Sequence, residues 1–114
     1  MKIEKFEDIL SWQKSKELTL LIYKAMRPCK DYGYRDQIQR ASVSIMNNIA
    51  EGYERRTNND FRHFLYIAKG SSGECRSLLD LGLELGYFTK EEHKALYNLS
   101  VEISKLLSGL IKAL

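Results

Sequence analysis

The two histidines, His63 and His93, are the residues with the clearest potential for metal chemistry. A di-iron centre in a helical bundle needs Glu-x-x-His on two helices and two further glutamates. Asp60 and Lys90 stand three residues before these histidines, so the signature is missing. We therefore expect no metal site, and we expect both imidazoles to lie on the surface.

Nucleophilic and phosphate-loop chemistry find little support either. Cys75 falls on an apolar helical seam, which is typical of a small buried side chain and not of a reactive thiol. The segment Gly70-Ser71-Ser72-Gly73 lacks the lysine and the preceding strand of a phosphate loop. No serine has a spaced histidine and acid that would activate it. The sequence predicts a non-enzymatic protein with no catalytic residue and no cofactor.

A polar stripe runs along the second apolar-periodic segment at steps of 3, 4, 4 and 3, which place it on one helical face. It consists of Gln37, Arg40, Ser44, Asn48 and Glu51. One interpretation is a solvated face. The other is a polar network between helices or subunits, in which Arg40 would pair with Glu51 or Glu74 because a buried charge needs a partner.

A row of basic residues recurs every seven positions in the third periodic segment: Arg62, Lys69 and Arg76. We call these three residues the basic row. Tyr66 lies within its span, and Arg55 and Arg56 precede the segment. Such a row could follow a phosphate backbone while Tyr66 stacks on a base. The alternative is a charged face that only contacts solvent. These six residues are the candidate nucleic-acid contacts.

Helical periodicity dominates the whole chain, and no alternation typical of strands is present. The spacing predicts helices over residues 11–26, 35–52, 58–85 and 90–113. Ser11 or Asp8 would cap the first helix, Pro28 follows its end, and Gly52 would stop the second. Because each helix has one apolar stripe, we expect an all-α, antiparallel up-down-up-down four-helix bundle formed by residues 1–114 as a single domain.

The third and fourth segments have the clearest seams and caps. Residues 61, 65, 68, 72, 75, 79 and 82 form one seam, and residues 96, 99, 103, 106, 110 and 113 form the other. Thr57 with Asp60, and Thr89 with Glu92, resemble capping boxes, and Gly86 would end the third helix. Gly70 and Gly73 each cost about 1 kcal/mol inside a helix, so we expect another helix to approach them closely.

Composition limits the remaining function classes. The 114 residues carry 18 Lys and Arg against 15 Asp and Glu, a net charge of +3, which permits an anionic partner without requiring one. No apolar run is long enough to span a membrane, and two cysteines make no disulfide framework, so we expect a cytoplasmic protein without a membrane partner. Apolar residues outside the seams suggest self-association: Val43, Met46, Leu81, Leu83 and Val101.

Four stretches carry a resemblance to a known bacterial family. They are Gln37 to Ile45 with Asn48-Ile49-Ala50-Glu51-Gly52, Phe6-Glu7-Asp8 with Trp12-Gln13-Lys14, Phe64 to Ser71 with Glu74, and Leu85-Gly86-Tyr87. The chain resembles the four-helix-bundle proteins named after the 23S rRNA intervening sequence. This resemblance implies a homo-oligomer, a pentameric ring, in which Arg40, Asn48, Glu51 and Arg55 are structural or interface residues.

The same family is related to the accessory protein of diversity-generating retroelements, a basic pentamer that binds nucleic acid and a reverse transcriptase. The present chain is far less basic than that protein, at +3. Together, the residues and the resemblance lead us to expect a homo-oligomeric helical scaffold that binds RNA or a nucleoprotein. The alternative is a protein–protein interaction module with no nucleic-acid role.

Overall fold

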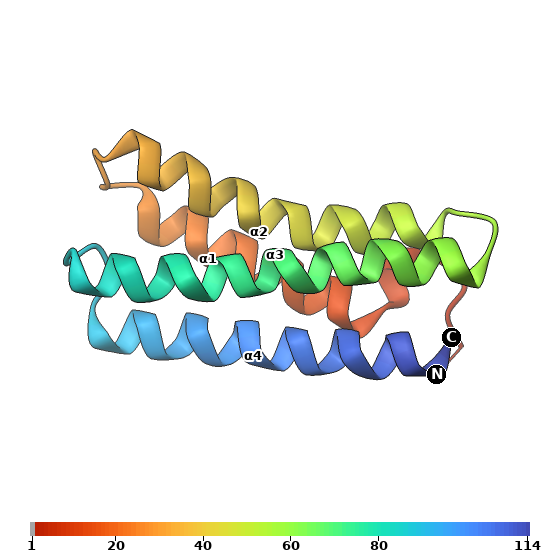
Figure 1. Cartoon of the computed structure of the whole chain (residues 1–114). Coiled ribbons are helices and arrows are strands. Elements are labelled where there is room, and N and C mark those ends of the chain that lie inside the picture. Colours follow the sequence, from red (N-terminus) through yellow and green to blue (C-terminus); the bar gives the residue numbers. More distant parts are fainter. Residues whose placement is uncertain (1) are drawn as a thin grey trace.

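Four long helices arranged side by side account for nearly all of the chain (Figure 1). The structure is a computed structural model that describes residues 2–114. A 3-10 turn at Phe6–Asp8 precedes α1 (Leu10–Met26), α2 (Tyr32–Tyr53), α3 (Asn58–Glu84) and α4 (Lys90–Ala113). Residues 2–114 contain no strand. The predicted all-α bundle is confirmed, and the bounds of α1, α3 and α4 agree with prediction within one residue.

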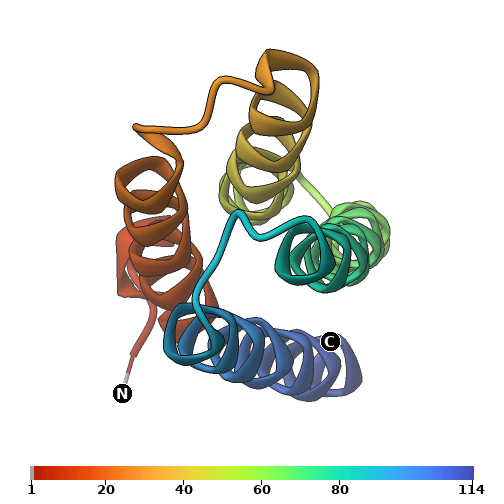
Figure 2. The same ribbon diagram turned by 90° about the vertical axis from the view of Figure 1, so that its left-hand side faces the viewer.

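Each helix packs against its neighbours in the chain, and α4 closes the ring against α1. Figure 2 looks down the bundle and shows the helices around a common centre in the order α1, α2, α3, α4. Successive helices run in opposite directions, as short connections require. The bundle measures 42 × 23 × 19 Å. An elongated bundle of this kind presents long grooves between neighbouring helices.

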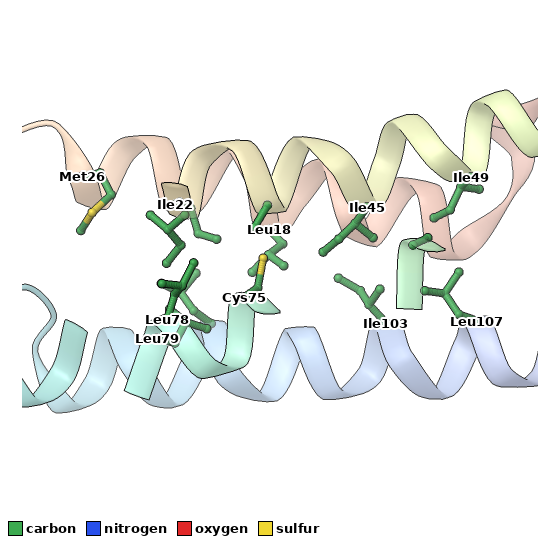
Figure 3. Packing of buried hydrophobic residues seen from close by; sticks show 14 of the residues in the cluster. Leu18, Ile22, Met26, Ile45, Ile49, Cys75, Leu78, Leu79, Ile103 and Leu107 are labelled. Atoms are coloured by element: carbon green, nitrogen blue, oxygen red, sulfur yellow. The ribbon is translucent and has the colours of Figure 1, made fainter. Parts of the chain in front are cut away.

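The core consists of branched aliphatic side chains contributed by all four helices (Figure 3). Leu18 and Ile22 of α1, Ile45 of α2, Leu79 of α3 and Ile103 of α4 are all fully buried. Small hydroxyl residues fill several buried positions, and all of them except Ser11, whose Oγ has no partner within residues 2–114, donate to backbone carbonyls. For example, Ser15 Oγ donates to the Ser11 carbonyl at 2.6 Å. These bonds satisfy buried polar groups that would otherwise be costly.

The seam predicted for α3 is buried from Leu65 to Gly82. The seam predicted for α4 is only partly right, because the buried residues there are Leu96, Ser100, Ile103, Leu107 and Ile111. Leu99, Leu106 and Leu110 are half-buried instead, and Ala113 is exposed. A straight helix has 3.6 residues per turn, so a strict seven-residue pattern drifts off the core-facing side.

Helix caps explain where the structure departs from the predicted boundaries. Asp31 accepts a hydrogen bond from the Tyr34 amide at 3.2 Å, so α2 begins three residues earlier than predicted. The predicted caps of α1 are wrong. Ile9 occupies the cap position without a side-chain bond, while Asp8 accepts from the amides of residues 4 and 5 and Ser11 is buried inside α1. The Thr89–Glu92 capping box forms in full, whereas Thr57 makes only its own half.

Gly52 and Gly86 have different roles, although both were predicted to end helices. Gly86 ends α3 with a φ of +79°, a conformation that glycine adopts without strain. Gly52 lies inside α2, where a Cβ atom would stand 2.8 Å from the Cβ of Phe64. The prediction that Gly52 stops α2 is therefore wrong: glycine is needed there because α3 packs closely.

Gly70 and Gly73 face away from the core, and no helix of the same chain approaches them closely, so the predicted close approach would need a helix of another copy. A Cβ at Gly70 would meet nothing within 4 Å, and one at Gly73 would meet only the Arg76 guanidinium at 3.6 Å. Nothing within residues 2–114 therefore offsets the helix propensity lost at these two positions.

Candidate functional site

The polar stripe on α2 makes contact with α3 at its centre. Ser44 Oγ lies 2.9 Å from Ser71 Oγ across the two helices. Asn48 Nδ2 donates to the Ser44 carbonyl at 2.8 Å and to Ser44 Oγ at 3.0 Å. All three side chains are half-buried. The middle of the stripe is thus an interhelical hydrogen-bond cluster, whereas its ends are solvated.

Arg40 does not form the ion pair with Glu51 or Glu74 that was considered for it. Within residues 2–114 it has no salt bridge, and it lines a shallow groove with Gln37 and Glu74 at the exposed side of the α2–α3 contact. Glu51 instead lies 3.5 Å from Arg55, one turn further along the chain. Arg40 is exposed and hydrated, so its charge needs no protein partner.

Arg55 and Arg56 lie in the connection between α2 and α3, and both are exposed. The Arg55 guanidinium is 4.7 Å from the centre of the Phe64 ring, a cation–π distance. Together with Glu51, this contact holds Arg55 near the start of α3. Exposed pairs of this kind contribute at most about 1 kcal/mol, so Arg55 could exchange its carboxylate partner for a stronger anionic ligand.

Three candidate contacts lie on the outer side of α3. Arg62 donates to the Asn59 side-chain carbonyl and is half-buried, whereas Lys69 is exposed. The Tyr66 ring is 59% exposed. An aromatic face in solvent between two cations can stack on a planar group while the cations contact negative charge.

Arg76 has a different environment from the other two members of the basic row. Its Nη1 donates to Ser104 Oγ at 2.8 Å, to Ser72 Oγ at 3.3 Å and to the Ser100 carbonyl at 3.4 Å. Ser104 Oγ donates in turn to Ser72 Oγ at 3.1 Å. This network spans α3 and α4, so the Arg76 guanidinium is fixed at the junction of the two helices.

A groove on the α3–α4 side of the molecule was not predicted. It has a volume of about 490 Å³, and α4 contributes all of its lining except Arg76. The lining consists of Arg76, Val101, Ser104, Lys105, Ser108, Gly109 and Lys112. Lys105 and Lys112 are spaced by seven residues, as in the basic row, and this repeat was the available signal. It was missed because the basic pattern was sought on one helix alone.

The titratable groups elsewhere are engaged in local structure. His93 Nε2 lies 2.7 Å from Asp80 Oδ1, and its side chain is only 18% exposed, so the expected surface position is wrong for His93 and right for His63. Burial raises the pKa of the Cys75 thiol to about 12, which keeps it protonated and inert. No three His, Cys, Asp or Glu residues within 2–114 are grouped to hold a metal ion. No helix of this part of the chain has the length and hydropathy to cross a membrane.

Comparisons with known proteins agree with this architecture. Residues 7–109 match the family described as "23S rRNA-intervening sequence protein". No curated protein matches the chain. A crystal structure of a protein with unknown function from the S23 ribosomal protein family of Bacteroides thetaiotaomicron is similar in fold, with a TM-score of 0.85 and 31% sequence identity. The similarity covers 90% of the present chain and 96% of that one.

Proposed function

The chain belongs to the family of 23S rRNA-intervening sequence proteins, and from this premise we propose that it is a non-enzymatic, cytoplasmic helical scaffold that self-associates and binds RNA. The observation that carries the proposal is the outer side of α3, where half-buried Arg62 and exposed Lys69 flank an exposed tyrosine. Positive charge supplies sequence-independent attraction to phosphates, and an aromatic ring supplies stacking on bases. A chain with a net charge of only +3 needs such local grouping to attract a polyanion.

Self-association is supported by the outward surface of α3 on its α2 side. Gly70 leaves this surface without a side chain, so a helix of another copy could approach the backbone closely. Leu81 and Leu85 lie near the end of the same helix, and each is 49% exposed. Exposed leucines in a small protein are typical of an interaction surface. In line with the family resemblance, we propose a pentameric ring.

A protein-interaction module is the second candidate function, and the same exposed apolar residues favour it. Ile67 is 40% exposed, and it shares the α2 side of α3 with Leu81. If a partner protein covers these side chains, then the cations on the other side of α3 serve only solubility. The two functions therefore differ in which side of α3 contacts the partner: the side with the cations for RNA, and the side with Ile67 and Leu81 for a protein.

Light scattering tests the assembly. We expect a mass of about five times 13.3 kDa, near 67 kDa, at micromolar concentration, and a mass of 13.3 kDa would contradict self-association. A Leu81→Arg variant should lower the mass, because a charge placed on a buried interface is unfavourable. A matched Leu20→Arg variant on α1, where Leu20 is 61% exposed, should leave the mass unchanged.

Fluorescence anisotropy with labelled RNA tests the binding. The affinity should fall steeply with salt, and Arg62→Glu with Lys69→Glu should weaken it about tenfold or more at low salt. Tyr66→Ala should cost about 1–3 kcal/mol of binding energy if the ring stacks on a base. Absence of RNA binding at low salt, together with nuclease-resistant capture of one partner protein that Ile67→Arg abolishes, would favour the interaction module instead.

A further inference from the structure

The groove between α3 and α4 brings cations from two helices to one place. Arg76 reaches it from α3, and Lys105 and Lys112 reach it from α4. Because the helices are antiparallel, α4 runs back along the side of α3 that carries the basic row. The network between Arg76, Ser72 and Ser104 fixes this register. Arg76, the last member of the basic row, is therefore also part of a basic groove.

Hydroxyl groups and free guanidinium donors add hydrogen-bonding capacity to this charge. Ser104 and Ser108 line the groove beside the lysines. The hydrogen bonds of Arg76 within residues 2–114 leave from Nη1, so Nη2 and Nε keep donors for a ligand. Donors that are already held in place lose little freedom when they bind an anion.

The α3–α4 groove has no carboxylate in its lining, in contrast to the groove between α1 and α4, which contains Glu17 and Glu102. Glu102 is the acid nearest to the groove in sequence. It lies 3.7 Å from Lys14 of α1, in the α1–α4 groove, which shares Val101 and Lys105 with the α3–α4 groove. Asp80 of α3 is occupied by His93. The charged residues that line the α3–α4 groove itself are all cations.

The dimensions of the groove indicate an extended ligand. Lys105 and Lys112 are seven residues apart, which corresponds to about 10 Å along the helix axis. A single phosphate group contacts both lysines only if their side chains bend towards each other. A chain of phosphates contacts each lysine where it lies, and the apolar floor provided by Val101 and Gly109 leaves room for flat groups beside it.

We propose that the α3–α4 groove, formed by Arg76, Lys105 and Lys112 with the Ser104 and Ser108 hydroxyls, binds the phosphodiester backbone of a single RNA strand. This inference rests on the proposed RNA-binding function and deepens it, because it assigns the phosphate contacts to α4 as well as α3. Arg76 holds the strand at the junction of the helices, and the two lysines hold it along α4.

Binding of a fluorescein-labelled single-stranded RNA of about 20 nucleotides tests the proposal by anisotropy at several salt concentrations. The groove variant Lys105→Glu with Lys112→Glu should bind about tenfold more weakly or worse at low salt. The charge-matched control is Lys24→Glu with Lys30→Glu, exposed positions on α1 and the α1–α2 connection. Both variants lower the net charge from +3 to −1, since each exchange changes it by −2. The control should lose less than about threefold.

A neutral variant gives a second readout that does not introduce repulsion. Lys105→Gln with Lys112→Gln should reduce the slope of log affinity against log salt by about 1.4, because each phosphate contact on a single strand contributes about 0.7. Circular dichroism and light scattering should match the wild type for all variants, since these lysines are exposed. A polyglutamate peptide of equal charge should compete poorly, because its carboxylates are not spaced like phosphates along a nucleic-acid strand.

The outcomes separate the two levels of the proposal. If the wild type binds RNA and only Arg62→Glu with Lys69→Glu weakens it, the groove assignment is overturned while the proposed function stands. Equal losses in the groove variant and the control, or equal competition by polyglutamate, also overturn the assignment, because both indicate nonspecific charge. If the wild type binds no RNA at low salt, the proposed function itself is wrong.

Discussion

Replacing Gly82 with alanine is the most direct test of how the ends of α2 and α3 are fastened together. A Cβ atom at this position would overlap the Tyr34 hydroxyl and would stand 2.7 Å from the Phe88 ring. Tyr34 donates a hydrogen bond to the Leu78 carbonyl, and both residues are buried. The extra methyl group cannot fit unless Tyr34 moves, and that movement breaks the bond.

The expected loss of stability follows from three contributions. Overpacking a filled site costs about 1–3 kcal/mol. Leaving the buried Tyr34 hydroxyl or its acceptor unpaired costs about 1–3 kcal/mol more. Alanine has a better helix propensity than glycine, which offsets about 1 kcal/mol of this loss of stability. The free energy of unfolding should therefore fall by about 1–5 kcal/mol, which lowers the melting temperature by roughly 4–20 °C for a domain of this size.

Urea unfolding followed by circular dichroism at fixed protein concentration measures this loss, because self-association makes stability depend on concentration. The double variant Tyr34→Phe, Gly82→Ala removes the oxygen atom that the methyl group meets first. Gly82→Ala should therefore cost at least about 1 kcal/mol less in the Tyr34→Phe background than in the wild type. Gly109→Ala on α4, where a Cβ meets nothing within 4 Å, is the control and should stabilise the fold. A Gly82→Ala protein as stable as the wild type, or an equal cost in both backgrounds, would refute the packing argument.

Three further predictions use other parts of the molecule. Gly70→Ala should raise the free energy of unfolding of an isolated chain by about 1 kcal/mol, because a Cβ at this position meets nothing within 4 Å. If the variant instead forms a smaller oligomer than the wild type by light scattering, Gly70 lies in a contact between subunits. Cys75 should resist alkylation at pH 8 until the protein unfolds, since burial raises its pKa to about 12, and half-buried Cys29 should react first; equal rates would contradict the buried position. The Tyr87 hydroxyl donates to Asp31 at 2.7 Å and lowers the pKa of that carboxyl, so this contact stabilises the fold above about pH 4 and is lost as the pH falls through the lowered value. Tyr87→Phe should flatten the dependence of stability on pH in that acidic range, and an unchanged acid titration of stability would argue against the contact.

The number and type of elements could be predicted because the apolar residues recur at helical spacing, and Thr57 and Thr89 add local caps. Boundaries set by packing could not. Gly52 was predicted to end the second helix, because glycine is common both at helix ends and where two helices pack closely. Only the position of Phe64 shows that close packing is the reason for glycine at this position. The predicted start at residue 35 left Tyr32 and Gly33 outside the second helix, although the Asp31 cap starts α2 just before them.

The sequence could predict the part of the candidate site that lies on a single helix, but not the part that depends on how α4 packs against α3. Lys69 and Arg76 hold equivalent positions in the seven-residue repeat, yet Lys69 is exposed and Arg76 is fixed by serines of α4. Sequence spacing places both on the same side of α3 but says nothing of the helix that packs there. Lys105 and Lys112 become relevant through that packing, because the antiparallel turn at Gly86 brings α4 back beside Arg76.

Helical geometry also makes the two proposed activities compatible on α3. Successive residues are about 100° apart around a helix, so Gly70 points well away from Lys69, and Ser77 likewise from Arg76. Further around α3, on the side of the helix that is closer to α2, lie the exposed side chains of Ile67 and Leu81. The basic row faces α4 instead, as the bonds from Arg76 to Ser104 require. A second copy could therefore cover the glycine and leucine side while the α3–α4 groove stays open to RNA, and the helix that holds subunits together would also present the nucleic acid along the outside of the assembly.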